Sequence, residues 1–290
     1  MIGPPSEFLI QLLNGIQYGL LLFLLASGLS LIFGIMGVLN LAHGSFYMVG
    51  AYVAFWLSRE LGNMWLAIPV ELATVLLIGL ILESALFSRL YHRDHLQQVL
   101  LSFGLILIFE ELRSIFFGDD VHGVPVPPLL RASIPLTDTL SYPVYRLFIS
   151  GTCLLIAGLM YLVIQQTRVG MMIRAGSTNR EMVQSLGINI KLIYRWVFAL
   201  GLTLAAAAGM IAAPVSSVYP GMGNQILIIC FVVVVVGGIG SIKGALISAL
   251  AIGIVDTLGQ VLLPEFSGVA VYLLMAVILL WRPQGLFRVA

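Results

Sequence analysis

Nine long apolar runs, separated by short polar stretches, follow one another along this chain. They cover residues 8–33, 46–58, 65–87, 97–117, 142–165, 193–213, 226–241, 245–263 and 268–282. Most of them approach the ~20 residues that a helix needs to cross a bilayer, whereas a membrane barrel would show alternating segments of ~10 residues. The pattern therefore predicts a bundle of eight or nine membrane-spanning α-helices.

The composition supports lipid as the solvent for most of the chain. Hydrophobic residues make up 60% of the 290 residues and charged residues only 9%, whereas soluble domains carry roughly 25% charged residues. Backbone polar groups in lipid must find their partners within the protein, and a helix provides these partners by itself. We expect one all-α, polytopic domain over residues 1–290. The net charge of +1 gives no reason to expect a nucleic-acid partner.

Glycines interrupt the apolar pattern at two places. The stretch GIMGVLNLAHGS begins at Gly34, before the second run, and GGIGSIKGA begins at Gly237, at the end of the seventh run. Both of these runs are short for a membrane crossing. Irregular backbone at membrane depth is tolerated where it is buried in protein or lines a wet cavity. Two interpretations of the second break stay open: close helix packing through small residues, or a broken helix that lines a transport path.

Polar groups and helix breaks at membrane depth mark candidate functional positions, because they are costly to place in lipid. The candidates for a translocation path are Asn40 and His43 in the first break, Gly237, Gly238 and Gly240 in the second break, and Asp256 within the eighth run. For His43 the alternative is a packed, hydrogen-bonded histidine. For Asp256 the alternative is hydrogen bonding between helices.

Other ionisable residues are interpreted as structural. Glu83 is expected to lie at a cytoplasmic helix end, together with Arg89 and Arg93. His92 and His95 have the i, i+3 spacing of metal ligands. A tetrahedral site needs more ligands than this basic loop supplies, so no metal site is expected.

Basic residues in the loops predict the orientation of the bundle. Residues 168–195 carry a net charge of +4, and residues 118–141, with Asp138 among them, carry −2. The first loop is therefore expected in the cytoplasm and the second outside. Arg282 and Arg288 place the C-terminus in the cytoplasm as well. Nine crossings would put the N-terminus outside, and eight would put it inside.

The polar stretch over residues 168–192 contains the signals of a short helix. Thr178 and Glu181 have the spacing of a capping box, in which the hydroxyl and the carboxylate accept hydrogen bonds from free backbone N–H groups at a helix start. Gly187 supplies the left-handed residue that commonly ends a helix. These signals predict a helix over residues 179–186 in a cytoplasmic coupling loop.

This helix is predicted to have one apolar face. Met182, Val183 and Leu186 fall at i, i+1 and i+4, and Asn179 is expected to face away from them and to contribute little. A helix of two turns is not stable alone in water, so it needs a surface to lie against. That surface is either the lipid headgroups or the groove of a cytosolic partner protein.

No sequence motif supplies an energy source or a catalytic centre. The stretch GGIGSIKG lacks the glycine that a phosphate-binding loop has before Lys243, and the motifs G-x-S-x-G and H-E-x-x-H do not occur. We therefore expect a chain that is not an enzyme and binds no cofactor itself. Any nucleotide hydrolysis would therefore take place on a partner.

Four stretches resemble one group of transport proteins. RAGSTNREMVQSLGIN, residues 174–189, is similar to the cytoplasmic coupling segment of ABC importer permeases. GVLNLAHGSFYMVGAY (37–52), VVVVVGGIGSIKGALISA (232–249) and RPQGLF (282–287) resemble the branched-chain amino acid permeases of the LivH type, and the similarity covers essentially the whole chain. The Glu-Ala-Ala pattern common in such coupling segments is Glu181, Met182 and Val183 here.

The resemblance implies a multi-pass permease subunit of an ABC importer in a bacterial inner membrane. Such a subunit pairs with a second, homologous permease and docks two cytosolic ATPase subunits, which hold ATP and Mg²⁺. It receives branched-chain or other hydrophobic amino acids from an extracytoplasmic substrate-binding protein, and relatives carry urea, short amides or aromatic acids. The alternative is an ATP-independent channel or secondary transporter for a small polar solute such as urea, which would use broken helices but no capped cytosolic helix.

Overall fold

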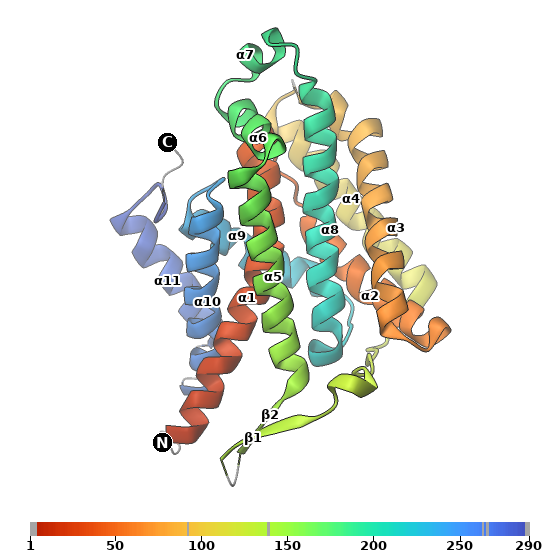
Figure 1. The fold of residues 1–290 in the computed structure, drawn as a ribbon, viewed down its shortest axis with the longest axis vertical. Helices are drawn as coiled ribbons and strands as arrows, with labels where there is room; N and C mark the ends of the chain where they lie inside the picture. Colours follow the sequence, from red (N-terminus) through yellow and green to blue (C-terminus); the bar gives the residue numbers. More distant parts are fainter. Residues whose placement is uncertain (1–4, 92, 138–139, 263, 265–266, 288–290) are drawn as a thin grey trace.

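The protein is an elongated helix bundle (Figure 1). The computed structural model describes residues 5–91, 93–137, 140–262, 264 and 267–287. Of the residues considered from the sequence, His92, Asp138 and Arg288 lie outside these ranges. The α-helices in the described residues are α1 (Pro5–Met36), α2 (His43–Leu61), α3 (Met64–Ala85), α4 (His95–Phe117), α5 (Val144–Gln166), α6 (Arg168–Thr178), α7 (Arg180–Ser185), α8 (Ile190–Ser216), α9 (Met222–Gly237), α10 (Ile242–Leu262) and α11 (Ser267–Trp281). The predicted all-α bundle is confirmed.

Each of the nine apolar runs corresponds to one helix, and α6 and α7 occupy the polar stretch between the fifth and sixth runs. Five helices are long and apolar enough to cross a bilayer by themselves, namely α1, α3, α5, α8 and α10. The seventh run is short, as predicted, because α9 has 16 residues. The second run is longer than predicted, because α2 begins at His43 and reaches 19 residues.

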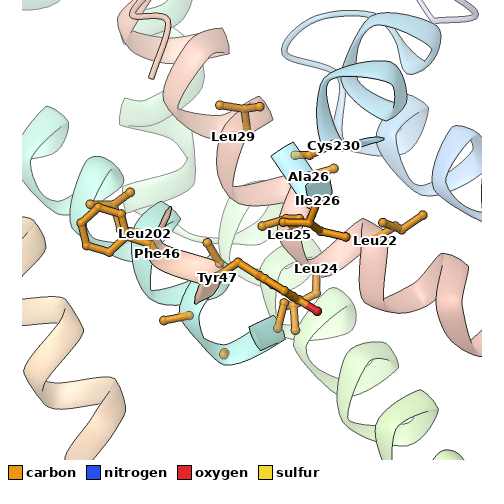
Figure 2. Close-up of a cluster of buried hydrophobic side chains, with 14 of the residues drawn as sticks. Leu22, Leu24, Leu25, Ala26, Leu29, Phe46, Tyr47, Leu202, Ile226 and Cys230 are labelled. Atoms are coloured by element: carbon orange, nitrogen blue, oxygen red, sulfur yellow. The ribbon is translucent and has the colours of Figure 1, made fainter. Parts of the chain in front are cut away.

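Two long helices form the centre of the bundle. The most apolar stretch of α1 is 83% buried and that of α8 is 78% buried, whereas the corresponding stretches of α3, α5 and α10 are 17–28% buried. Side chains from α1, α2, α8 and α9 meet in one apolar cluster, drawn in Figure 2, which includes Leu22, Leu25, Leu29, Phe46, Leu202, Ile226 and Cys230. The most apolar stretches of these outer helices therefore remain largely uncovered by the rest of this chain.

Small residues let these central helices approach closely. A Cβ atom added to Gly28 of α1 would overlap the carbonyl oxygen of Gly201 on α8. One added to Gly209 of α8 would overlap the carbonyl oxygen of Tyr47 on α2 in the same way. Backbones in such contact gain dispersion energy along their length, which is the main attraction between helices where lipid surrounds the protein.

The loop between α4 and α5 contains structure that the apolar pattern did not predict. Strands β1 (Ser133–Thr137) and β2 (Leu140–Pro143) pair antiparallel, and short 3-10 turns occur at Phe87–Arg89 and Pro128–Leu130. The predicted fifth apolar helix, 142–165, starts two residues late because residues 142 and 143 belong to β2. In Figure 1 this hairpin and the start of α1 lie at one end of the bundle, and α6 and α7 lie at the opposite end.

Candidate functional site

The short helix predicted in the polar stretch exists as α7, but it is capped by a different residue. Asn179 has an extended backbone, and its side-chain oxygen accepts a hydrogen bond from the backbone N–H of Met182 at 3.0 Å. Thr178 still belongs to α6, and its hydroxyl donates to a carbonyl one turn earlier in that helix. The predicted capping box of Thr178 and Glu181 is therefore wrong, because α6 keeps Thr178 helical and moves the cap by one residue.

The end of α7 follows the prediction. Gly187 has φ of 80°, the left-handed conformation that a helix end commonly requires. The backbone N–H of Ile188 donates to the carbonyl of Val183 at 3.3 Å, and that of Gly187 donates to the carbonyl of Gln184 at 2.9 Å. These bonds satisfy carbonyls that the short helix leaves free.

The side chains of α7 do not form the single apolar face that was predicted. Val183 is only 3% exposed and packs against the rest of the protein, whereas Met182 is 62% exposed and Leu186 is 71% exposed. Met182 lies on α7 and Leu186 is the residue that caps its end, and neither side chain packs against the rest of the chain as Val183 does. Two apolar side chains thus stay in contact with solvent at this end of the bundle.

Arg180, the first residue of α7, connects this helix to the core of the bundle. Its guanidinium donates to the carbonyl of Met36, at the end of α1, at 3.4 Å. It also lies over the ring of Tyr194 on α8, 4.9 Å from the ring centroid, in the arrangement of a cation–π interaction. One side chain of α7 therefore contacts both central helices.

An ion pair lies at the same end of the bundle. Glu83 lies close to the end of α3, where a helix end was expected, and Nε of Arg195 on α8 donates to its carboxylate at 3.1 Å. The hydroxyl of Tyr91 also donates to this carboxylate. Burial raises the pKa of Tyr91, and the hydrogen bond to Glu83 raises it further. Glu83 thus has two hydrogen-bond donors, although it is almost fully buried.

The second glycine break is a place of close contact. A Cβ atom added to Gly237 would lie 2.5 Å from the carbonyl carbon of Gly244, and one added to Gly34 of α1 would lie 2.7 Å from the Cα atom of Gly240. Gly238 has φ of 96° and Gly240 has φ of 83°, which other residues rarely adopt. The chain therefore turns sharply between α9 and α10, and of the two interpretations this geometry favours close packing.

The segment that follows α11 completes this turn. The backbone N–H of Leu286 donates to the carbonyl of Val236 at 2.8 Å, and that of Phe287 donates to the carbonyl of Gly237 at 3.1 Å. A Cβ atom added to Gly238 would overlap the carbonyl oxygen of Phe287. The end of α9 is thus held by backbone contacts with a segment far away in the sequence.

The two polar residues of the first break are fully buried. Asn40 accepts a hydrogen bond from the backbone N–H of Ala42 at 3.1 Å. Nε2 of His43 lies 3.0 Å from the carbonyl oxygen of Leu25, so this nitrogen carries the proton and donates. The second ring nitrogen of His43 and the side-chain nitrogen of Asn40 have no hydrogen-bond partner among the residues that the structure describes. Both residues support the entry of the chain into α2.

A cavity of about 470 Å³ lies in the half of the bundle that is remote from α7. Residues of α1, α2, α5, α8, α9 and α10 and of the α8–α9 link line it. Asp256 is the one predicted path residue on its wall, and its carboxylate accepts a hydrogen bond from Gln260 at 2.9 Å. Arg146 lines it as well, although the sequence analysis did not select this residue.

The comparisons with known proteins agree with this architecture. Residues 11–280 match the protein family described as "Branched-chain amino acid transport system / permease component". The high-affinity branched-chain amino acid transport system permease protein BraD of Pseudomonas aeruginosa is 30% identical to this chain, and the alignment covers 97% of this chain and 95% of BraD.

Two permeases of Escherichia coli strain K12 match as well. LivH is 27% identical, with 96% of this chain and 95% of LivH covered, and LivM is 27% identical, with 91% of this chain and 67% of LivM covered. Both are permease proteins of the high-affinity branched-chain amino acid transport system. The family match spans far more than half of the sequence and includes α7, both breaks and the cavity. This chain therefore belongs to the family of branched-chain amino acid transport system permease components.

Proposed function

We propose that this chain is one membrane subunit of an ATP-driven importer for branched-chain or other hydrophobic amino acids. It pairs with a second, homologous permease in the bacterial inner membrane. Two cytosolic subunits hydrolyse ATP with Mg²⁺, and an extracytoplasmic binding protein delivers the substrate. The names of BraD, LivH and LivM support the substrate class, and the existence of two related permeases in one organism supports a heterodimer.

The observation that carries this proposal is the solvent-exposed pair on α7. Met182 and Leu186 are large apolar side chains in the most basic loop of the chain, where lipid tails cannot cover them if that loop lies in the cytoplasm. Burial of each side chain in a protein groove would contribute about 1.5–3 kcal/mol of favourable transfer free energy. Coupling to ATPase subunits would then run through Thr178, Glu181, Met182, Val183, Leu186 and Gly187, with Arg180 as the link to the bundle.

The same loop supports an orientation of the bundle in the membrane. With α7 in the cytoplasm, the C-terminal segment that contacts α9 also lies at the cytoplasmic side, and the hairpin end faces outside. The start of α1 then lies outside, as nine crossings require. The cavity, in the outer half, is the place where substrate enters the translocation path. Asp256 lines this path directly, and Asn40, His43, Gly237, Gly238 and Gly240 shape the helix breaks beside it.

The test is Leu186→Asp in the complex of both permeases with the ATPase subunits. A carboxylate placed in an apolar groove would lose its water without gaining a partner, which costs several kcal/mol. We expect the variant to insert normally but to lose its ATPase subunits in a pull-down and to lose ATP-driven uptake in proteoliposomes. Gln184→Asp is the matched control, because Gln184 is exposed on another side of α7, and it should retain the ATPase subunits.

Two results would refute the proposal. One is a pull-down in which Leu186→Asp retains the ATPase subunits as well as the unchanged protein does. The other is robust uptake by this chain alone, without ATP, because that behaviour belongs to a channel or a secondary transporter.

A further inference from the structure

The cavity in the outer half of the bundle carries two opposite charges. Among the described residues that line it, Arg146 on α5 and Asp256 on α10 are the charged ones. No ion pair joins Arg146 or Asp256 to any residue that the structure describes. One cation and one anion thus face the same space without neutralising each other through direct contact.

The guanidinium of Arg146 is held in place by neutral groups. It donates to the side-chain oxygen of Asn14 at 2.8 Å and to that of Gln17 at 3.4 Å, both on α1. A guanidinium has five N–H donors in a planar fork, so donors remain after these two bonds. Such a fork fits a carboxylate through two parallel hydrogen bonds. A carboxylate in the cavity would find an oriented cation there.

The carboxylate of Asp256 is held in a comparable way. The side-chain N–H of Gln260, one turn later on α10, donates to one of its oxygens at 2.9 Å. A carboxylate offers about four lone-pair sites, so most of its accepting capacity is free. A charged group at membrane depth is costly without a partner of opposite charge. An ammonium group in the cavity would provide that partner.

Branched apolar side chains line part of the remaining wall, beside polar ones such as Gln11 and Gln225. The apolar ones include Leu21 of α1, Ile149 of α5, and Ile226 and Ile229 of α9. An apolar side chain that leaves water for this surface gains about 25 cal/mol per Å². A ligand that matches the two charges and these apolar side chains has one carboxylate, one ammonium group and an apolar part.

We propose that this cavity is a binding site for the zwitterion of a hydrophobic α-amino acid. Arg146 binds the α-carboxylate, Asp256 binds the α-ammonium group, and the apolar wall takes the side chain. The inference rests on the proposed function and adds a recognition step to it: the membrane subunit itself selects a zwitterion after the binding protein has released it. An uncharged solute such as urea would leave both charges unpaired.

The experiment measures ligand discrimination on the purified complex of both permeases and the ATPase subunits, without the binding protein. Unlabelled L-leucine, 4-methylpentanoate and isopentylamine compete with bound radiolabelled L-leucine. The second ligand lacks the ammonium group and the third lacks the carboxylate. On the unchanged complex each should compete at least about tenfold more weakly than L-leucine, which corresponds to about 1.4 kcal/mol.

Two variants give opposite expectations. In Asp256→Asn, unlabelled L-leucine should compete at most about threefold more strongly than 4-methylpentanoate, since the variant removes the partner of the ammonium group alone. The advantage of L-leucine over isopentylamine should stay. Arg146→Gln should reduce the advantage of L-leucine over isopentylamine and keep its advantage over 4-methylpentanoate. A variant that merely misfolds would weaken all three ligands together and would not produce this crossed pattern. Thr74→Val on α3, outside the lining of the cavity, is the control and should keep both differences in competition.

The outcomes separate this inference from the proposed function. Three results would overturn the zwitterion site. They are unchanged differences in competition in both variants, a uniform loss of binding for all three ligands, and no binding of L-leucine to the unchanged complex. Each of these results leaves the ATPase pull-down with Leu186→Asp untouched. Loss of the crossed pattern with intact ATPase docking would therefore refute the site alone.

Discussion

Helices α1 and α5 have the same hydropathy and opposite surroundings. Their most apolar stretches both have a mean hydropathy of 2.3, yet that of α1 is 83% buried within the chain and that of α5 is 17% buried. Lipid and protein interior are equally apolar for a leucine, so hydropathy predicts that a helix crosses the membrane and not where it lies in the bundle. The position must come from another property of the sequence.

The two helices differ in whether the backbone of another helix lies against their glycines. A Cβ atom added to Gly15 of α1 would lie 2.9 Å from the Cα atom of Ile254, and one added to Gly19 would lie 2.8 Å from the carbonyl oxygen of Ala249, both on α10. For Gly158 of α5, no atom of the described part of the chain lies within 4 Å of such a Cβ position. Glycine content alone is therefore insufficient, and what matters is whether another backbone lies opposite.

The largest difference is expected between two single variants, each with one glycine changed to leucine, one in α1 and one in α5. Gly28→Leu in α1 would force a side chain into the backbone of α8, at a cost of about 3 kcal/mol or more. Gly158→Leu in α5 adds a side chain where there is space and should change stability by less than about 0.5 kcal/mol. The yield of monodisperse protein in detergent and its thermal midpoint measure both. Equal yields for the two variants would contradict the claim that close backbone contact at glycines separates α1 from α5.

A smaller effect is expected at the turn between α9 and α10, where the opposing backbone belongs to a loop. Gly238→Leu meets the carbonyl of Phe287 and requires a left-handed conformation that leucine resists. We expect ATP-driven uptake to be abolished, while this chain still copurifies with its partner permease. Gly104→Leu on α4, where a Cβ atom has no neighbour within 4 Å, is the control. Near-normal uptake by Gly238→Leu would show that the turn tolerates bulk.

The smallest effect concerns α7, which has little packing of its own. Asn179→Ala was expected to be mild from the sequence, but Asn179 is the cap of this helix. Its loss should cost about 1 kcal/mol and weaken the binding of ATPase subunits about fivefold. Asn179→Asp, which keeps the capping oxygen, should bind like the unchanged protein. A titration of ATPase subunits onto the purified permeases measures both, and equal affinities for Ala and Asp would exclude a capping role.

Much of the fold could be predicted because long apolar runs and left-handed glycines are local signals. The apolar helices, the presence of a break in the chain from Gly237 and the end of α7 at Gly187 follow from such signals, whereas the seventh run was predicted to continue to residue 241 and α9 ends at Gly237. Helix α6 could not be predicted, since its polar composition resembles a loop. The cap of α7 was predicted at Thr178 instead of Asn179 because both residue types are good caps and the extent of α6 decides between them.

The cavity could not be predicted because its wall comes from segments far apart in the sequence. Asp256 was noticed for its position inside an apolar run. Arg146 was not, since it lies near the start of α5, where a basic residue next to a loop is ordinary. Its contacts with Asn14 and Gln17, more than a hundred residues away in the sequence, give it a place in the cavity. Only the packing of α1 against α5 reveals this.

The contact between the end of α9 and the segment after α11 has a consequence for biogenesis. The carbonyls of Val236 and Gly237 receive their hydrogen bonds from Leu286 and Phe287. At a synthesis rate of about 5–20 residues per second, these partners leave the ribosome roughly 3–10 s after α9 does. During that interval the end of α9 depends on water or on the insertion machinery for its hydrogen bonds. The turn between α9 and α10 is therefore among the last parts of this protein to reach its final structure.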